Sequence, residues 1–235
     1  MPTKTKVRNM FDSIAGDYDA LNHILSLDVD KIWRKKALKQ IVDAPAPVQV
    51  LDLACGTGDF SIAIAKALSS ATGSHVTGVD LSEGMLAVMR EKVAKADLTE
   101  MISIEEGDGE NLRFPDNTFD RVTIAFGIRN FENREKGLRE MLRVLKPGGR
   151  LVILELSRPE NKVIRWFYDL YFLHILPKIG GKVSGDKAAY AYLPASVAAF
   201  PGKKAFMATM REAGFRTVTH KAFTLGICRM YTGEK

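Results

Sequence analysis

The chain has few cysteines, no long apolar run and no strong excess of one charge. Its 235 residues include two cysteines, Cys55 and Cys228, which cannot form a disulfide framework and indicate a reducing compartment. No stretch of about 18 apolar residues occurs, so no segment is predicted to cross a bilayer. The N-terminal sequence MPTKTKVRNMF lacks the apolar core of a signal peptide, and we expect a cytoplasmic protein.

Other features that the sequence lacks argue against particular classes of function. The formal net charge is +6, but Lys and Arg are spread along the chain, so no arm for binding nucleic acid is evident. A mildly basic surface also suits an anionic membrane face. The four histidines lack the spacing of metal ligands, and no bound metal is expected. With 46% hydrophobic residues and no internal repeat, the chain is predicted to form one globular domain spanning residues 1–235.

The chain is organised around the sequence VQVLDLACGTGD at residues 48–59. Its apolar start predicts a buried parallel strand, which ends in Asp52 and is followed by the turn Gly56-Thr57-Gly58 and a helix over residues 60–68. A strand, a glycine turn and a helix in this order are typical of a nucleotide site, although a generic turn in any α/β protein gives the same pattern. The third glycine of a dinucleotide fingerprint is missing, and the carboxylates of Asp52 and Asp59 favour a cationic ligand. S-adenosylmethionine carries an ammonium, a sulfonium and a ribose but no phosphate.

Two further strands are predicted to end in acidic residues. The strand over residues 75–79 is followed by Asp80, which suits both hydroxyls of a ribose. The alternative is a carboxylate at the start of the next helix, where Ser82 is the better cap. The strand over residues 101–106 is followed by Asp108 and Gly109, and the aspartate can accept from an adenine amino group. The alternative there is an ordinary turn.

The fourth predicted strand, residues 121–125, is followed by the sequence FGIRN. Ligands of open α/β sheets bind beyond the carboxyl ends of the strands. We therefore expect Arg129 and Asn130 to lie where a substrate meets the cofactor. The alternative is that Arg129 pairs with a neighbouring acid such as Glu132.

Two segments lie outside the alternating pattern. Residues 1–44 are predicted to form a cap of two or three short helices, with Tyr18 and Asn22 on one face. Tyr18 fits either a substrate contact or a core position with its hydroxyl at the rim. Residues 157–200 hold eight of the 20 aromatic residues. Within them, residues 163–176 suit a buried helix, the wall of an apolar pocket or an interfacial helix, and residues 180–194 suit a flexible lid.

The order of elements predicts an α/β fold. After the N-terminal helices we expect three βα units, then a strand, a helix over 134–145 and a strand over 150–156. A helix over 201–213 and a hairpin of strands at 215–221 and 226–231 complete the chain. The prediction is a Rossmann-like, doubly wound, mostly parallel seven-stranded sheet with an antiparallel terminal strand, as in class I S-adenosylmethionine-dependent methyltransferases.

Several longer segments resemble the UbiE/MenG/Coq5 family of quinone C-methyltransferases. They are FDSIAGDYDALNHILSL, LDLACGTGDF, GVDLSEGML, LRFPDNTFDRVTIAFGIRNF, REMLRVLKPGGRLVILELSRP and YAYLPASVAAFPG. The segments LDLACGTGD and LKPGG are common to many methyltransferases, whereas FGIRN and YAYLPASVAAFP are more specific. The matching segments run almost from end to end.

The resemblance implies methylation of a ring carbon of a prenylated quinol, most simply demethylmenaquinol. It implies cofactor contacts at Thr57, Asp80, Asp108 and Gly109, and at the position of Ala125, where the family often has serine. Arg129 is expected to stabilise a ring oxyanion, and Asn130 and Tyr18 to orient the ring. Asp28 and Asp30 stand where many relatives have glycine and histidine, so no role is assigned to that segment.

Four other functions stay open on the sequence. They are methylation of a benzoquinol of the ubiquinone pathway, methylation of a small molecule or sterol, methylation of a nucleic acid, and S-adenosylmethionine binding without catalysis. A prenylated substrate implies transient contact with the inner face of a membrane. The oligomeric state is open, with a homodimer included.

Overall fold

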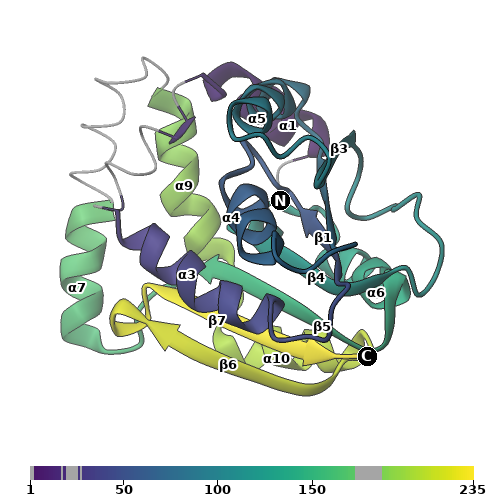
Figure 1. Cartoon of the computed structure of the whole chain (residues 1–235). Coiled ribbons are helices and arrows are strands. Elements are labelled where there is room, and N and C mark those ends of the chain that lie inside the picture. The colour runs from purple at the N-terminus through teal and green to yellow at the C-terminus, as the bar shows by residue number, and fades with distance from the viewer. Residues whose placement is uncertain (1–2, 17, 20–25, 27, 173–186) are drawn as a thin grey trace.

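The computed structural model describes the chain except for residues 1–2, 17, 20–25, 27 and 173–186. Seven strands form one sheet in the order β3-β2-β1-β4-β5-β7-β6 (Figure 1). The strands are β1 (Gln49–Leu53), β2 (His75–Asp80), β3 (Ile102–Glu106), β4 (Phe119–Ala125), β5 (Leu145–Leu156), β6 (Arg216–Phe223) and β7 (Cys228–Glu234). β1 to β5 pair in parallel, and β7 runs antiparallel to both β5 and β6. The predicted fold class is confirmed.

Helices cover both faces of the sheet (Figure 1). The α-helices are α1 (Lys4–Ile14), α3 (Val29–Ile41), α4 (Asp59–Leu68), α5 (Glu83–Lys95), α6 (Arg134–Val144), α7 (Lys162–Leu170), α9 (Lys187–Ala199) and α10 (Lys203–Glu212). Two short 3-10 helices, η1 (Ile128–Asn130) and η3 (Thr224–Gly226), follow β4 and β6. No helix in the described part of the chain is long and apolar enough to cross a membrane.

The core is divided by the sheet into two apolar layers. Alternate residues of each strand face opposite sides, so Val50 packs against α3, α4 and α5, whereas Leu51 and Leu53 pack on the side of α6 and α10. All three side chains are fully buried. These two layers hold the carboxyl ends of β1 and β4 side by side, where the strand order reverses and an open sheet offers a ligand site.

One predicted βα unit is absent. β1 and β2 are each followed by a helix, but the chain passes from β3 to β4 through residues 107–118 without one. These residues are rich in turn formers, with glycine at 107 and 109 and the sequence Pro115-Asp116-Asn117. The expectation of three βα units was therefore wrong by one helix.

The segment after β5 also differs from the prediction. α7 begins near the expected residue but ends at Leu170, and residues 173–176 lie outside the described chain. Of the predicted lid at 180–194, residues 180–186 are outside the described chain, whereas residues from Lys187 belong to α9. The alanines of KAAYAYLPASVAA favour a helix strongly enough to accommodate Pro194 within it. The prediction of a flexible turn was wrong for this part.

The remaining boundaries shift by a few residues. β5 begins at Leu145 rather than 150, because Leu145 pairs with Phe119 before a register shift. The predicted C-terminal hairpin is present as β6 and β7. The positive φ of Gly214, +110°, follows the end of α10 as expected of a glycine after a helix.

Candidate active site

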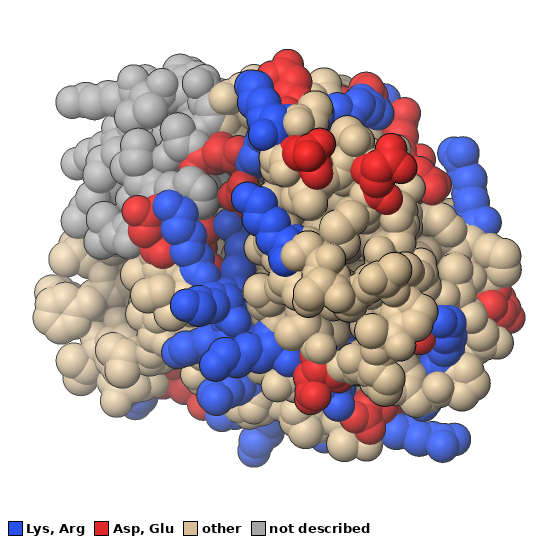
Figure 2. All heavy atoms as spheres, in the orientation of Figure 1, with Lys and Arg blue, Asp and Glu red and all other residues tan. Residues whose placement is uncertain are grey.

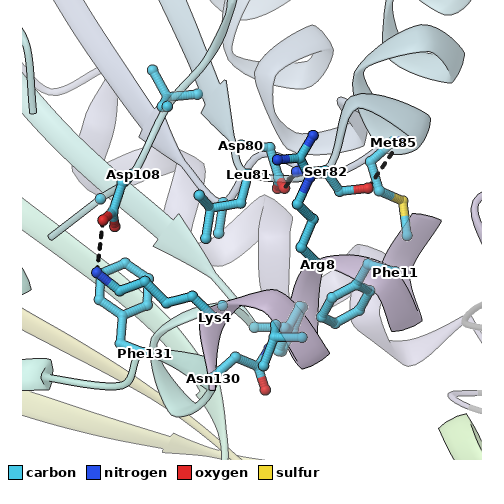
Figure 3. A pocket seen from close by; sticks show the side chains of 18 of the residues that line it. Lys4, Arg8, Phe11, Asp80, Leu81, Ser82, Met85, Asp108, Asn130 and Phe131 are labelled. Atoms are coloured by element: carbon cyan, nitrogen blue, oxygen red, sulfur yellow. Dashed lines mark hydrogen bonds and ion pairs between the residues drawn. The ribbon is translucent and has the colours of Figure 1, made fainter. Parts of the chain in front are cut away.

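A cavity lies at the carboxyl ends of β1, β2, β3 and β4, under the N-terminal helix α1 (Figure 3). Its volume is about 80 Å³, smaller than the roughly 300–1,000 Å³ of typical small-molecule sites. Part of the reason is that Lys4, Val7, Arg8 and Phe11 of α1 line it. A bound nucleoside therefore requires these side chains to move outward. A smaller depression beside Thr57 adjoins the cavity, and Tyr18 borders both.

The glycine turn after β1 is tied to the end of β2. Gly58 has a φ of +84°, and a Cβ atom there would lie 2.5 Å from Cγ of Met89, so both the conformation and the packing require glycine. The backbone N–H of Gly56 donates to Oδ2 of Asp80 at 2.9 Å. Asp80, at the end of β2, is therefore in direct contact with the glycine turn after β1.

Asp80 is positioned by backbone donors from two loops. Besides Gly56, the N–H of Ser82 donates to Oδ1 of Asp80 at 2.9 Å. Each carboxylate oxygen keeps lone pairs for a hydroxyl donor. Burial raises the pKa of the Asp80 carboxyl, and the backbone donors oppose the rise. Ser82 caps α5 by accepting from the N–H of Met85 at 3.2 Å, which confirms the sequence interpretation of that position.

Asp108 and Gly109 lie on the cavity wall after β3 (Figure 3). Oδ2 of Asp108 pairs with Nζ of Lys4 at 2.6 Å, and Oδ1 accepts from the N–H of Glu110 at 2.9 Å. A Cβ atom on Gly109 would lie 2.7 Å from Cζ of Phe131, so only glycine fits there without a shift of that ring. Lys4 was not predicted, because it is 104 residues from Asp108 in the sequence.

The depression beside the glycine turn is surrounded by paired charges. Oγ1 of Thr57 donates to Asp19 at 2.5 Å, and Asp19 also pairs with Lys92 at 2.6 Å. Asp59 pairs with Lys92 at 2.5 Å and with Arg34 at 3.3 Å. The charge of Asp59, predicted to suit a cationic ligand, is therefore already shared with two cations of the chain.

Asp52 is buried on the floor of this depression, where it is 1% exposed and accepts from Oγ of Ser61 at 2.5 Å. Burial raises the pKa of the Asp52 carboxyl from 3.8 to about 7, although the Ser61 hydrogen bond and Arg34 oppose the rise. Ala125 lies at the end of β4 and lines both the cavity and the depression. It has no hydroxyl to offer a ligand.

The raised pKa of Asp52 predicts that the free energy of unfolding depends on pH. Between about pH 3.8 and about pH 7 the folded chain holds a proton that the unfolded chain has released. The proton on Asp52 stabilises the fold fully below the pKa that this carboxyl has in the unfolded chain. This stabilisation is lost as the pH rises through the pKa that it has in the folded chain. Relative to Asp52→Asn, the wild-type free energy of unfolding should fall by roughly 1.4 kcal/mol per pH unit in this window. Denaturant unfolding across the window measures it, and a difference that does not vary with pH would contradict the raised pKa.

Arg129 lies on η1 and is 6% exposed. Its Nη1 donates to Oε1 of Glu155 at 2.8 Å and to the carbonyl of Phe126, and its backbone N–H donates to Oε2 of Glu155 at 3.0 Å. Burial lowers the pKa of Arg129, but the Glu155 carboxylate together with Tyr18 and Tyr192 more than offsets this, so the pKa is raised and the guanidinium stays charged. Its acidic partner is Glu155 and not Glu132.

Sequence reasoning missed Glu155, although the signal was present. It is the single charged residue within the buried strand sequence LVILEL and is fully buried in β5. An isolated carboxylate in such a strand needs a cationic or hydrogen-bonding partner.

Asn130 and Tyr18 lie close to Arg129. Asn130 lines the cavity (Figure 3). Its Oδ1 accepts from the hydroxyl of Tyr192 at 2.8 Å. Tyr18 is half-buried, packs edge-on against Phe11, and is among the groups whose charge raises the pKa of Arg129. The structure thus brings together the three predicted substrate residues. Asn22, predicted to share a face with Tyr18, lies outside the described residues.

The lining of the two hollows suits a ligand with positive charge. The lining carboxylates are those of Asp52, Asp59, Asp80, Asp108 and Glu110, and the lining cations are Lys4, Arg8 and Arg34. Lys4 pairs with Asp108 and Glu110, and Arg34 with Asp59, so a cationic ligand would replace these side chains as the partner of the carboxylates.

Comparison with known proteins agrees with this geometry. The model of the ubiE/COQ5 methyltransferase family matches residues 2–235. The chain belongs to the ubiE/COQ5 methyltransferase family. It is 49% identical over 98% of its length to the Ubiquinone/menaquinone biosynthesis C-methyltransferase UbiE of Geobacter sulfurreducens, covering 88% of that protein. It is 45% identical over 98% of its length to the Demethylmenaquinone methyltransferase of Bacteroides fragilis, covering 92% of that protein.

A solved structure supports the fold of this ubiE/COQ5 family member. The SAM-dependent methyltransferase of Thermotoga maritima superposes with a TM-score of 0.64 at 20% identity, over 97% of this chain and 99% of that one. At that identity the likeness concerns the fold alone.

Proposed function

We propose that the chain transfers a methyl group from S-adenosylmethionine to a ring carbon of a prenylated quinol, with demethylmenaquinol as its natural substrate. The observation that carries the proposal is the grouping of Asp80, Asp108 and Asn130 around one cavity, with the buried and permanently charged guanidinium of Arg129 directly before Asn130 in η1. The names of the two relatives support the reaction class.

Residues at the ends of four strands would hold the cofactor. Asp80 would accept from the ribose hydroxyls and Asp108 from the adenine amino group, once Lys4 has moved from Asp108. Asp52 and Thr57 would face the ammonium end, and Gly56 and Gly109, which line the cavity without side chains, would let a ligand approach the backbone closely. When bound, S-adenosylmethionine supplies a methyl group on a positively charged sulfur.

Arg129 would make the ring carbon nucleophilic. A phenol has a pKa of about 10, so holding the quinol hydroxyl ionised near pH 7 requires roughly 4 kcal/mol of stabilisation. A buried guanidinium supplies part of it, because charge interactions strengthen in a low-dielectric site. Asn130 and Tyr18 would orient the ring. Because Arg129 stays charged, it does not accept the proton that the ring carbon loses after methylation, and water is the expected acceptor.

The chain would reach its lipid substrate from the cytoplasmic face of a membrane. α7 exposes Val163, Trp166 and Phe167, each more than 60% accessible, and Leu225 on η3 is 72% accessible. Lys and Arg side chains gather over α3, beside this apolar end of the molecule (Figure 2). An apolar surface flanked by cations suits anionic lipid headgroups over an acyl layer. A homodimer stays a prediction, which light scattering tests.

Removing the exposed apolar groups of α7 should weaken membrane binding. We expect Val163→Ser combined with Trp166→Ser to lower partition onto vesicles containing anionic lipid roughly tenfold or more, because each side chain contributes about 1.5–3 kcal/mol when fully buried. Cosedimentation with vesicles measures it. Lys204→Gln, an exposed change on α10 at the other sheet face, is the control. Equal partition of the wild type and the double variant would refute this contact.

The substrate assignment is tested with labelled S-adenosylmethionine and a panel of acceptors. We expect transfer to reduced demethylmenaquinol with a short tail, and less to the matching demethylated benzoquinol. Preference for the benzoquinol would move the chain to the ubiquinone pathway. Cofactor binding without transfer to any quinol would favour the non-catalytic alternative.

A further inference from the structure

A second cavity lies among α3, α7, α9 and η3, apart from the hollows that would hold the cofactor. Its volume is about 490 Å³, within the roughly 300–1,000 Å³ of small-molecule sites. Its walls are almost entirely apolar, and include Trp33, Leu156, Ile164, Phe167, Leu193 and Ile227.

The polar groups of this cavity are nearly all engaged. Oγ of Ser26 donates to Asp30 at 2.6 Å, and Oγ1 of Thr224 accepts from Nε1 of Trp33 at 2.9 Å. The hydroxyl of Tyr168 differs, because it is buried and has no hydrogen-bond partner among the described residues. Tyr168 is only 8% accessible to solvent. Such walls suit a hydrocarbon with at most one polar group near Tyr168.

The inner end of the cavity adjoins the catalytic candidates. The ring of Trp33 lies 6.2 Å from the ring of Phe126, which lines the cofactor cavity. Leu193 of α9 lines the cavity, and Ser196 on the same helix accepts from Nε of Arg129 at 3.3 Å. Burial raises the pKa of the Tyr168 hydroxyl and the Arg129 guanidinium opposes this rise, so the two groups lie within electrostatic reach.

The outer end of the cavity reaches the exposed apolar surface. Phe167 and Leu225 line the cavity and are also 61% and 72% accessible, respectively. In Figure 1 α7 and the turn between β6 and β7 lie at the same end of the molecule. The cavity therefore extends from the surface that would meet a membrane to α9, the helix whose Ser196 contacts Arg129.

We infer that this cavity binds the isoprenoid tail of the substrate, with the Tyr168 hydroxyl donating to a ring oxygen where the tail meets the ring. The inference rests on the proposed function and adds the place where the tail lies. The tail has no hydrogen-bonding group and matches the apolar walls, while Tyr168 is the one described residue of the cavity wall with a buried polar atom that lacks a hydrogen-bond partner. The far end of a long tail would stay in the membrane.

Binding can be measured without methyl transfer. The chain has two tryptophans, and Trp166→Phe leaves Trp33, in the cavity wall, as the single fluorescent reporter. Titration of this variant with geraniol, farnesol and geranylgeraniol should give saturable changes in emission. Affinity should rise at least about tenfold for each added isoprene unit until the cavity is filled, since each unit buries five carbons. The unbranched alcohol hexadecanol should bind more weakly than geranylgeraniol.

Two neighbouring residues on α7 provide matched variants in that background. Ile164 lines the cavity, whereas Val163 is 66% accessible and does not. A carboxylate in the apolar wall is costly to bury against a hydrocarbon. Ile164→Asp should weaken geranylgeraniol binding at least a hundredfold, and Val163→Asp less than threefold. Circular dichroism and S-adenosylhomocysteine affinity would show that both variants are folded.

The same variants separate tail binding from catalysis. In detergent, Ile164→Asp should raise the KM for a prenylated quinol at least tenfold and leave kcat/KM for the tailless naphthoquinol ring unchanged. Tyr168→Phe should raise KM for both acceptors about tenfold while leaving geranylgeraniol binding intact. The inference is overturned if Trp33 emission does not respond to prenyl alcohols, if both α7 variants weaken binding equally, or if hexadecanol binds as tightly as geranylgeraniol. Prenyl binding without methylation of any quinol would instead overturn the proposed function and leave the cavity assignment standing.

Discussion

Arg129→Gln is expected to lower kcat for quinol methylation about 10²–10³-fold, with the affinity for S-adenosylmethionine within about twofold of the wild type. The guanidinium is 6% exposed and would stabilise the ring oxyanion where little water competes. Steady-state rates with labelled cofactor measure kcat, and calorimetric titration measures cofactor affinity. Arg139→Gln, an exposed change on α6, is the matched control.

The single variant leaves Glu155 buried without its cation, which by itself can destabilise a protein by roughly 3–5 kcal/mol. The double variant Arg129→Gln with Glu155→Gln removes both charges and should recover most of this stability. It should stay at least about a hundredfold slower than the wild type, because the oxyanion still lacks its cation. Recovery of activity together with stability would mean that Arg129 is a structural residue only.

Asp80→Asn is expected to weaken cofactor binding roughly 10–100-fold and to leave kcat at saturating cofactor within a fewfold of the wild type. A carboxylate that accepts from two ribose hydroxyls contributes more than a neutral amide, which can accept through one atom only. Asp97→Asn, an exposed turn residue with a φ of +56° that asparagine tolerates, is the control.

The stability of the Asp80→Asn protein separates binding from folding. Asparagine has one acceptor atom, so it can accept from only one of the two backbone donors, Gly56 and Ser82, that bond to Asp80. We expect a Tm without cofactor a few degrees below that of the wild type, and a smaller rise in Tm on adding S-adenosylhomocysteine. Unchanged cofactor affinity would remove Asp80 from the site.

The sequence predicted the parts of the site that depend on local pattern. The apolar run before Asp52, the glycines at 56 and 58, and the acid after β2 lie in a few consecutive residues each, so the strand, turn and helix could be placed from spacing. Because parallel strands end at one edge, these local predictions also placed Asp80 beside Gly56.

Contacts between distant segments could not be predicted in the same way. Lys4 with Asp108, Thr57 with Asp19 and Arg129 with Glu155 are separated by 104, 38 and 26 residues, respectively. Their pairing depends on how α1, the N-terminal segment and β5 pack, which no single-sequence periodicity encodes. The helical part of α9 was missed because residues 180–194 were interpreted as one flexible turn region.

The position of the transferred methyl group tests the central claim most directly. Wild-type protein, S-adenosylmethionine labelled with carbon-13 in its methyl group, and reduced demethylmenaquinol would be incubated, and the product examined by carbon NMR. Activation of the ring by Arg129 predicts a methyl group bonded to a ring carbon, with both oxygens still carrying hydroxyl groups. A methyl ether, or no labelled quinol from a folded protein that binds the cofactor, would contradict the account.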